Sequence, residues 1–318
     1  MSIIERVAEL LGPIERPNSK ASAPAESGGI PGLDLIERAV GERIEPSGFR
    51  ETMELASQPE AKSLAVESKA RARPARLTSK TTPTLRVDRD QLRRQGMITP
   101  DGVRTPIAEA FRRIKRQILA NVTNPKAGAS TNLVLVTSAL PGEGKTFCAI
   151  NLAITIALER DRTVLLVDAD VAKPSVPQVL GLKEKQGLLD VLLDRRIDLA
   201  EVLCKTDIGK LTVLPAGTAH QHATELLASD TMRELLQEMA ERYHDRIIIF
   251  DSPPLLVASE AGVLASQMGQ IVIVVEAGKT SEAALKTALG RIESSKVTGL
   301  LLNKGADPGL GYDYGGYG

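Results

Sequence analysis

Short runs of aliphatic residues alternate with longer segments of helical period in the last two thirds of the chain. From about residue 105, apolar residues three or four positions apart predict helices at 106–120, 145–159, 223–242 and 281–295. Between these helices, short apolar and β-branched runs predict strands at 132–137, 163–167, 211–214, 246–250, 270–275 and 298–302. Buried strands that are separated by helices indicate a mostly parallel β-sheet flanked by helices on both faces, which is an α/β fold.

The first hundred residues have a different pattern. Apolar residues between Ile3 and Leu11 lie at helical spacing and stop at Gly12, which predicts a short amphipathic helix. Residues 16–100 are rich in Pro, Ser, Ala and charge, so we expect this linker to be disordered or loosely helical. The chain is therefore divided into an N-terminal extension, a folded domain and a Gly-rich tail, at 1–104, 105–306 and 307–318.

The overall charge hides a basic segment. Hydrophobic residues make up 42% of the chain and charged residues 25%, and aromatic residues reach only 3%, so the core must be aliphatic. The net charge is zero, yet residues 69–116 contain 14 basic and 4 acidic residues, a net charge of +10. Such a segment could meet anionic lipid or nucleic acid, or remain an extended, solvated linker. Because aromatic residues for base stacking are scarce here, the linker is favoured and no nucleic-acid partner is expected.

Membrane and metal signals are also absent from the sequence. No apolar run approaches the ~18 residues that span a bilayer, and Glu5 and Glu9 lie where a signal peptide would be apolar. We therefore expect a cytoplasmic protein. Cys148 and Cys204 are too few for a disulfide framework and have no partners at zinc spacing, so they are interpreted as buried apolar residues.

A phosphate-binding loop, with the sequence ALPGEGKT, joins the first predicted strand to a helix. Gly142 and Gly144 let backbone N–H groups approach phosphate oxygens closely. Lys145 places a cation on the β and γ phosphates, Thr146 offers a hydroxyl to Mg²⁺, and the start of the helix adds its dipole. The motif predicts a P-loop NTPase fold. The expected nucleotide contacts are Pro141, Gly142, Glu143, Gly144, Lys145, Thr146 and Phe147.

Three aspartates follow two other predicted strands. Asp251 ends the run RIIIFD at the carboxyl edge of the sheet, where it is suited to hold the water shell of Mg²⁺. Asp168 and Asp170 end the run TVLLVDAD, two positions apart. Carboxylates beside a metal and a γ-phosphate can position the ion and accept a hydroxyl proton. We expect the catalytic residues to be Lys145, Asp168, Asp170 and Asp251, and the metal ligands to be Thr146, Asp168 and Asp251.

These three motifs and the tyrosine-bearing tail resemble the Walker A, A′ and B motifs of the bacterial tyrosine autokinases of polysaccharide synthesis and export. The resemblance covers about residues 105–318. It implies an ATP-dependent protein-tyrosine autokinase that uses Mg²⁺ and phosphorylates its tail in trans. Three of the four tyrosines, Tyr312, Tyr314 and Tyr317, lie within the last seven residues. A phenol on a Gly-rich tail can enter a neighbour's active site at small ordering cost.

The resemblance implies partners as well. The segment EAFRRIKRQI is similar to the ring-forming helix of the family and places Glu109, Arg112 and Lys115 on one helical face. Lys115 stands where Arg is usual and lacks its bidentate geometry, but a homo-oligomeric ring is implied. Asn303 matches a position that reads the adenine edge in related ATPases.

The chain resembles the free-standing members of the family, in particular those of exosortase-linked exopolysaccharide loci. This implies a separate membrane activator of the chain-length-determinant type, a tyrosine phosphatase, and a peripheral location at the inner face of the plasma membrane. The main alternative is an ATPase of the partition or septum-placement type, which shares the fold. Those ATPases usually carry a signature Lys at the second loop position, where this chain has Leu140.

Overall fold

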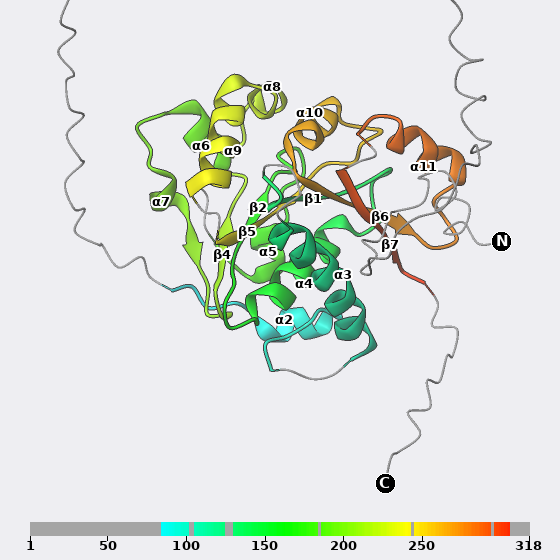
Figure 1. Cartoon of the computed structure of the whole chain (residues 1–318). Helices are drawn as coiled ribbons and strands as arrows, with labels where there is room; N and C mark the ends of the chain where they lie inside the picture. Colours follow the sequence, from blue (N-terminus) through cyan, green and yellow to red (C-terminus); the bar gives the residue numbers. More distant parts are fainter. Residues whose placement is uncertain are drawn as a thin grey trace, which may run out of the picture. The chain divides into compact units, whose positions relative to one another are not determined.

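The computed structural model describes residues 84–101, 105–124, 130–183, 186–242, 245–293 and 296–305. These residues build a seven-stranded sheet with the order β3-β4-β2-β5-β1-β6-β7 (Figure 1). Neighbouring strands are parallel, except that β3 runs antiparallel to β4. The strands are β1 (Leu133–Ser138), β2 (Thr163–Asp168), β3 (Cys204–Lys205), β4 (Leu211–Leu214), β5 (Arg246–Asp251), β6 (Gln270–Glu276) and β7 (Val297–Asn303). The predicted α/β fold and its six strands are confirmed; the two-residue β3 is too short to give a sequence signal.

Helices cover both faces of the sheet (Figure 1). Those on the first face are α2 (Arg89–Arg94), α3 (Pro106–Thr123), α4 (Lys145–Ala157) and α5 (Val176–Leu180). Those on the second face are α6 (Leu188–Leu193), α7 (Leu199–Val202), α8 (Ala223–Leu227), α9 (Asp230–Arg242), α10 (Ser259–Gln267) and α11 (Glu282–Leu289). Among the described residues, no helix is both long and apolar enough to cross a membrane.

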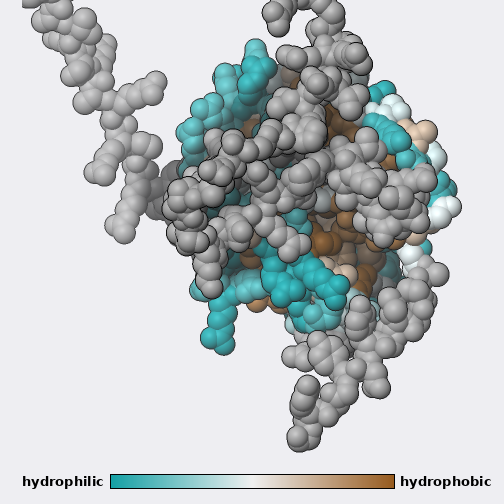
Figure 2. Space-filling model, turned by 45° about the vertical axis from the view of Figure 1, so that its right-hand side comes forward, coloured by the Kyte–Doolittle hydropathy of each residue, from teal (hydrophilic) through white to brown (hydrophobic). Residues whose placement is uncertain are grey.

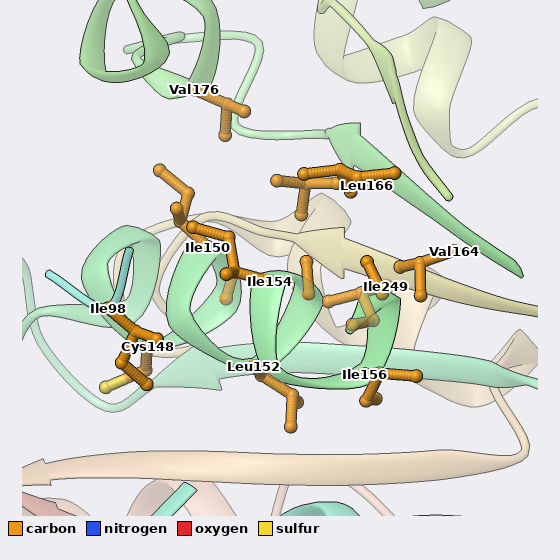
Figure 3. Packing of buried hydrophobic residues seen from close by; sticks show 14 of the residues in the cluster. Ile98, Cys148, Ile150, Leu152, Ile154, Ile156, Val164, Leu166, Val176 and Ile249 are labelled. Carbon is orange, nitrogen blue, oxygen red and sulfur yellow. The ribbon is translucent and has the colours of Figure 1, made fainter. Parts of the chain in front are cut away.

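Each strand supplies side chains to both layers of the core. In β2, Val164 and Leu166 pack with the first face, whereas Leu165 and Val167 pack with the second, as the two-residue period of a strand requires. Figure 3 shows Ile150 and Ile154 on α4 and Leu166 and Ile249 on strands of the sheet, all in the hydrophobic cluster of the first face. Because α4 is buried along most of its length, the loop that precedes it has a rigid support.

Two predicted helices differ from those observed. The segment 223–242 is split into α8 and α9, because the Ser229 hydroxyl accepts a hydrogen bond from the Met232 amide and caps a new helix. The helix predicted at 281–295 ends at Leu289, just before Gly290. Both differences leave the core pattern intact, since Met232 and Leu285 are buried as an amphipathic helix requires.

Residues 84–101, hereafter the strap, fold onto the first face of the sheet. Leu85 forms a bridge with Thr206 beside β3, and Leu92 is fully buried in the same cluster as the residues of α4. The Ile98 amide donates to the Asn151 side chain on α4 at 2.7 Å. The expectation of a disordered or loosely helical linker up to residue 100 is therefore wrong for the strap. The strap contacts the core at scattered points, so its apolar residues follow no regular period.

The surface retains a few large apolar side chains. In Figure 2, hydrophobic residues are visible between hydrophilic ones near the middle of the view. Among the described residues, the exposed large apolar side chains are Leu140, Leu158, Leu193, Val257, Val263 and Leu302. Scattered exposure of this kind is common on protein surfaces.

Candidate active site

The predicted P-loop and aspartates meet at the carboxyl edge of the sheet. Asp168 and Asp251 are directly paired residues at the ends of the adjacent strands β2 and β5. Strand β1 lies on the other side of β5 and continues into the P-loop at 139–146. Parallel sheets of this kind bind ligands beyond the carboxyl ends of their strands.

The conformation of the P-loop depends on its glycines. Gly142 and Gly144 have φ angles of 83° and 94°, in the left-handed region that other residues avoid. A Cβ atom at Gly144 would lie 2.1 Å from Nδ2 of Asn303. Helix α4 begins at Lys145 without a side-chain cap, so the amide groups of its first turn remain available to an anion.

Side chains from outside the loop hold it in place. The buried Glu143 carboxylate accepts hydrogen bonds from the Leu140 amide at 2.7 Å and from the Thr280 hydroxyl. Asn303 donates through Nδ2 to the Glu143 carbonyl at 2.9 Å, and Lys304 donates to the Gly142 carbonyl at 2.7 Å. Glu143 and Asn303 therefore support the loop, and the contact of Asn303 with adenine remains a prediction.

The other loop residues divide into exposed and packed positions. Pro141 lies exposed near the tip of the loop, whereas Phe147 packs partly buried against the first-face core. Sequence reasoning missed Thr280 and Lys304 as loop supports. No local pattern identifies them, because their partners lie 137 and 162 residues away.

Replacing Thr280 by Val is expected to raise the KM for ATP about tenfold and to change kcat less, because the buried Glu143 loses a hydrogen bond that orders the loop. Steady-state kinetics measures both constants. Thr287→Val is the matched control, since its hydroxyl bonds to the Ala283 carbonyl one turn earlier on the exposed face of α11. Equal KM values for the two variants would contradict this account of the loop.

The charged groups of the site are almost fully buried. Lys145 Nζ lies 2.8 Å from Asp170 Oδ2, with exposed side-chain fractions of 14% and 6%. Asp168 accepts through Oδ2 from the amides of Ser175 and Val176, both at 2.9 Å. The predicted pair Asp168 and Asp170 is thus brought to the site, but the two carboxylates have different partners.

Three carboxylate oxygens of the site lack a partner of ordinary hydrogen-bond geometry within the described residues. They are Oδ1 of Asp168 and both oxygens of Asp251. The Thr146 hydroxyl lies close enough to lower the pKa of Asp251, and it is 3.4 Å from the Ser175 hydroxyl. Buried carboxylate oxygens are costly to leave unpaired and are the ligands that hard divalent cations prefer.

Burial governs the protonation of these carboxyl groups. Desolvation raises the pKa of Asp251 to about 8, and repulsion by Asp168 adds to the shift. Burial likewise raises the pKa of Asp168 to about 6, although the two backbone amides oppose it. Burial and the neighbouring Asp251 raise the pKa of the Cys148 thiol to about 12, so this cysteine is a buried apolar residue as predicted.

These shifts predict how the nucleotide-free protein responds to pH. The folded-state pKa of Asp251 lies above its ordinary value of 3.8, so its protonated form favours folding. This contribution is complete below pH about 4 and is lost as the pH rises to about 8. Asp251→Asn is therefore expected to unfold at a higher temperature than the wild type at pH about 8, with a smaller difference at pH about 5.

Thermal unfolding in the presence of a chelator measures this effect. The matched control is Asp245→Asn at an exposed position, which is expected to follow the wild type at both pH values. If Asp251→Asn does not unfold at a higher temperature than the wild type at the higher pH, burial does not destabilise this carboxylate.

The residues of the expected ring helix have partners within the chain. On α3, Arg112 pairs with Glu109 one turn away, and Lys115 pairs with Glu159 beyond the end of α4. Lys115 retains an exposed side-chain fraction of 12%. A cross-subunit role for this face remains a prediction. Tyr312, Tyr314 and Tyr317 lie outside the described residues.

Comparison with known proteins agrees with this geometry. A family model described as an AAA domain matches residues 132–302. Together with the loop between β1 and α4, this match defines the chain as a nucleotide-binding protein of the P-loop class.

Similarity to individual proteins identifies the family within this class. The tyrosine-protein kinase YwqD of Bacillus subtilis is 34% identical over 206 residues, which are 64% of this chain and 84% of that protein. The succinoglycan biosynthesis transport protein ExoP of Rhizobium meliloti is 35% identical over 220 residues, 66% of this chain but only 26% of that protein. The kinase domain of the Escherichia coli tyrosine kinase ETK has a TM-score of 0.56 at 25% identity, covering 70% of this chain and 98% of that domain. The chain belongs to the family of bacterial tyrosine-protein kinases.

Proposed function

We propose that this chain is an ATP-dependent protein-tyrosine autokinase that phosphorylates the tyrosines of its C-terminal tail in trans and regulates exopolysaccharide synthesis or export. The observation that carries the proposal is the pair of buried carboxylates at 168 and 251, with unpartnered oxygens beside Lys145 and Thr146. A tyrosine-rich tail follows the same domain in sequence and supplies an acceptor.

The residues present fit a bound Mg²⁺. The Thr146 hydroxyl and the carboxylates of Asp168 and Asp251 would hold the ion, which neutralises charge on the phosphates when bound. Among the described residues, no group of three or more acidic, His or Cys side chains is spaced to hold a metal by itself. Mg²⁺ is usually held by one or two carboxylates together with water and substrate phosphates.

Lys145 and Asp170 then have linked roles. Lys145 turns from Asp170 to the β and γ phosphates, and the Asp170 carboxylate, 6% exposed, is left without its cation. The freed Asp170 carboxylate can then accept a hydrogen bond from the phenol of a tail tyrosine. The phenol oxygen of a tail tyrosine attacks the γ phosphorus, the bond to the ADP oxygen breaks, and the phenol proton passes to Asp170. Asp168 is the second candidate for this base, because its pKa is raised to about 6.

Assembly and location follow from the same proposal. A tail that is phosphorylated in trans requires a second copy of the chain, and we place the contact on the face of α3 that carries Glu109 and Arg112. Lys115, engaged with Glu159, contributes less to this contact. A separate membrane activator would bring the kinase to the inner face of the plasma membrane, and a tyrosine phosphatase would reset the tail.

The proposal is tested with purified protein, Mg²⁺ and γ-labelled ATP, followed by phosphopeptide mapping of the tail. Label on Tyr312, Tyr314 or Tyr317 supports it. ATP hydrolysis without phosphotyrosine would favour an ATPase of the partition type. The sequence disfavours that type, because Leu140 occupies the position of its signature Lys.

A further inference from the structure

The strap supplies hydrogen-bond donors to the C-terminal end of α5, the short helix that follows Asp168 and Asp170 in the sequence. On α2, the Gln91 side chain donates through Nε2 to the carbonyl oxygens of Gln178 at 2.8 Å and Val179 at 3.0 Å. The Asp88 amide donates to the Leu180 carbonyl at 3.1 Å. Carbonyl groups in the last turn of a helix lack partners in a next turn. The Gly181 amide also donates to the Gln178 carbonyl, and the strap supplies the donors to the carbonyls of Val179 and Leu180.

The other end of α5 holds the Asp168 carboxylate. The amides of Ser175 and Val176, at the start of the helix, both donate to Oδ2 of Asp168. Helix α5 has only five residues, and helices this short are unstable by themselves. Contacts at its two ends, together with the burial of Val176 and Leu180, therefore fix its position.

The strap itself is anchored away from the nucleotide loop. The Val87 amide and the Arg89 guanidinium both donate to the Asp207 carboxylate, at 2.9 and 3.2 Å, in the loop between β3 and β4. The P-loop, in contrast, is supported by Thr280, Asn303 and Lys304 at the ends of β6 and β7. The strap also contacts α4, through the hydrogen bond from the Ile98 amide to Asn151, whereas the Gln91 side chain bonds to α5. Gln91 is therefore the strap residue that tests the role of α5.

We propose that the strap, through Gln91, positions Asp168 for phosphoryl transfer by holding α5. Gln91 is a positioning residue, which acts on the site only through α5 and Asp168. The inference rests on the proposed kinase function. It makes the strap, which lies within the predicted N-terminal extension, part of the catalytic unit, and it predicts that the strap affects kcat more than the KM for ATP.

The first test compares Gln91→Ala with Gln95→Ala in the full chain. Both substitutions remove a glutamine side chain, Gln91 within α2 and Gln95 at its C-cap, and Gln95 is exposed. We expect Gln91→Ala to lower kcat about tenfold and to leave the KM for ATP within about twofold, because misplacing a catalytic group affects turnover first. Gln91→Glu keeps the side-chain length but has no amide hydrogens, so it should behave like Gln91→Ala. Hydrogen exchange in a peptide covering residues 174–182 should become faster in both variants.

A second pair of variants approaches the contact from α5. Gly181 and Gly96 have similar φ angles, 74° and 67°, but a Cβ atom at Gly181 would lie 2.8 Å from Cβ of Asp88, whereas Gly96 has open space around it. Substitution by Ala thus imposes the same backbone strain at both positions and pushes the strap from α5 only at Gly181. Gly181→Ala is expected to lower kcat relative to Gly96→Ala at a similar unfolding temperature.

Unchanged kcat in both Gln91→Ala and Gly181→Ala, relative to their controls, would overturn the inference. A rise in KM that matches the fall in kcat would also contradict it, because the strap would then affect nucleotide binding. If the wild-type protein transfers no phosphate to tyrosine, the proposed function fails first, and that result is seen before any variant is compared.

Discussion

Lys145→Met is expected to reduce tail phosphorylation by at least about a thousandfold, because one cation that neutralises the transferring phosphoryl group is lost. The Lys145 ammonium is 2.8 Å from Asp170 and has an exposed side-chain fraction of 14%. Met keeps most of the apolar stem, so the change removes mainly the charge. Radiolabel in the tail after a fixed time, against the wild type, measures the effect.

Lys205→Met is the matched control for this loss of charge. Lys205 is exposed on the edge strand β3, and its substitution is expected to leave phosphorylation unchanged. Thermal unfolding of both variants shows whether the unpaired Asp170 destabilises the fold. A Lys145→Met protein that labels its tail at the wild-type rate would rule out the proposed role of Lys145.

Replacing Tyr312, Tyr314 and Tyr317 together by Phe is expected to remove essentially all phosphotyrosine from the tail. The ring size is kept and only the accepting hydroxyl is lost, so the KM for ATP should stay within about twofold of the wild type. Mass spectrometry of the C-terminal peptide and an ATP titration give the two results.

The fourth tyrosine of the chain, Tyr243, provides the control. Tyr243→Phe is expected to retain the full phosphorylation of the tail. If the triple variant carries as much phosphotyrosine as the wild type, the acceptor lies elsewhere in the chain. Equal loss of phosphotyrosine in Tyr243→Phe would contradict the assignment to the tail.

The parts of the fold that were predicted correctly are those whose residue pattern lies within one short, continuous segment of the sequence. Strands such as β5 and β6 are buried on both faces, so their central residues form unbroken apolar runs in the sequence. Asp251 is the last residue of β5, and the P-loop glycines come a few residues after the end of β1. Their convergence at one edge then follows from the parallel sheet, before any side-chain contact is known.

The missed features depend on contacts between distant segments. Thr280 supports the P-loop across 137 residues, and the Gln91 side chain reaches α5 across 87 residues. Lys115 has the spacing of an interface residue, but its nearest partner is Glu159 of the same chain. Local periodicity reports that a side chain faces outward or inward, and it does not identify the group that the side chain meets.

Transfer of phosphate from one copy of the chain to another is tested most directly by mixing two variants. Lys145→Met keeps the tail tyrosines and lacks the proposed phosphate-binding cation, whereas the triple Phe variant keeps the active site and lacks the acceptors. Each variant alone should yield almost no tail phosphotyrosine. Incubated together with Mg²⁺ and ATP, they should produce phosphotyrosine at Tyr312, Tyr314 or Tyr317 of the Lys145→Met chain. A mixture that hydrolyses ATP but leaves those tyrosines unmodified, while the wild type modifies its own, would contradict transfer in trans.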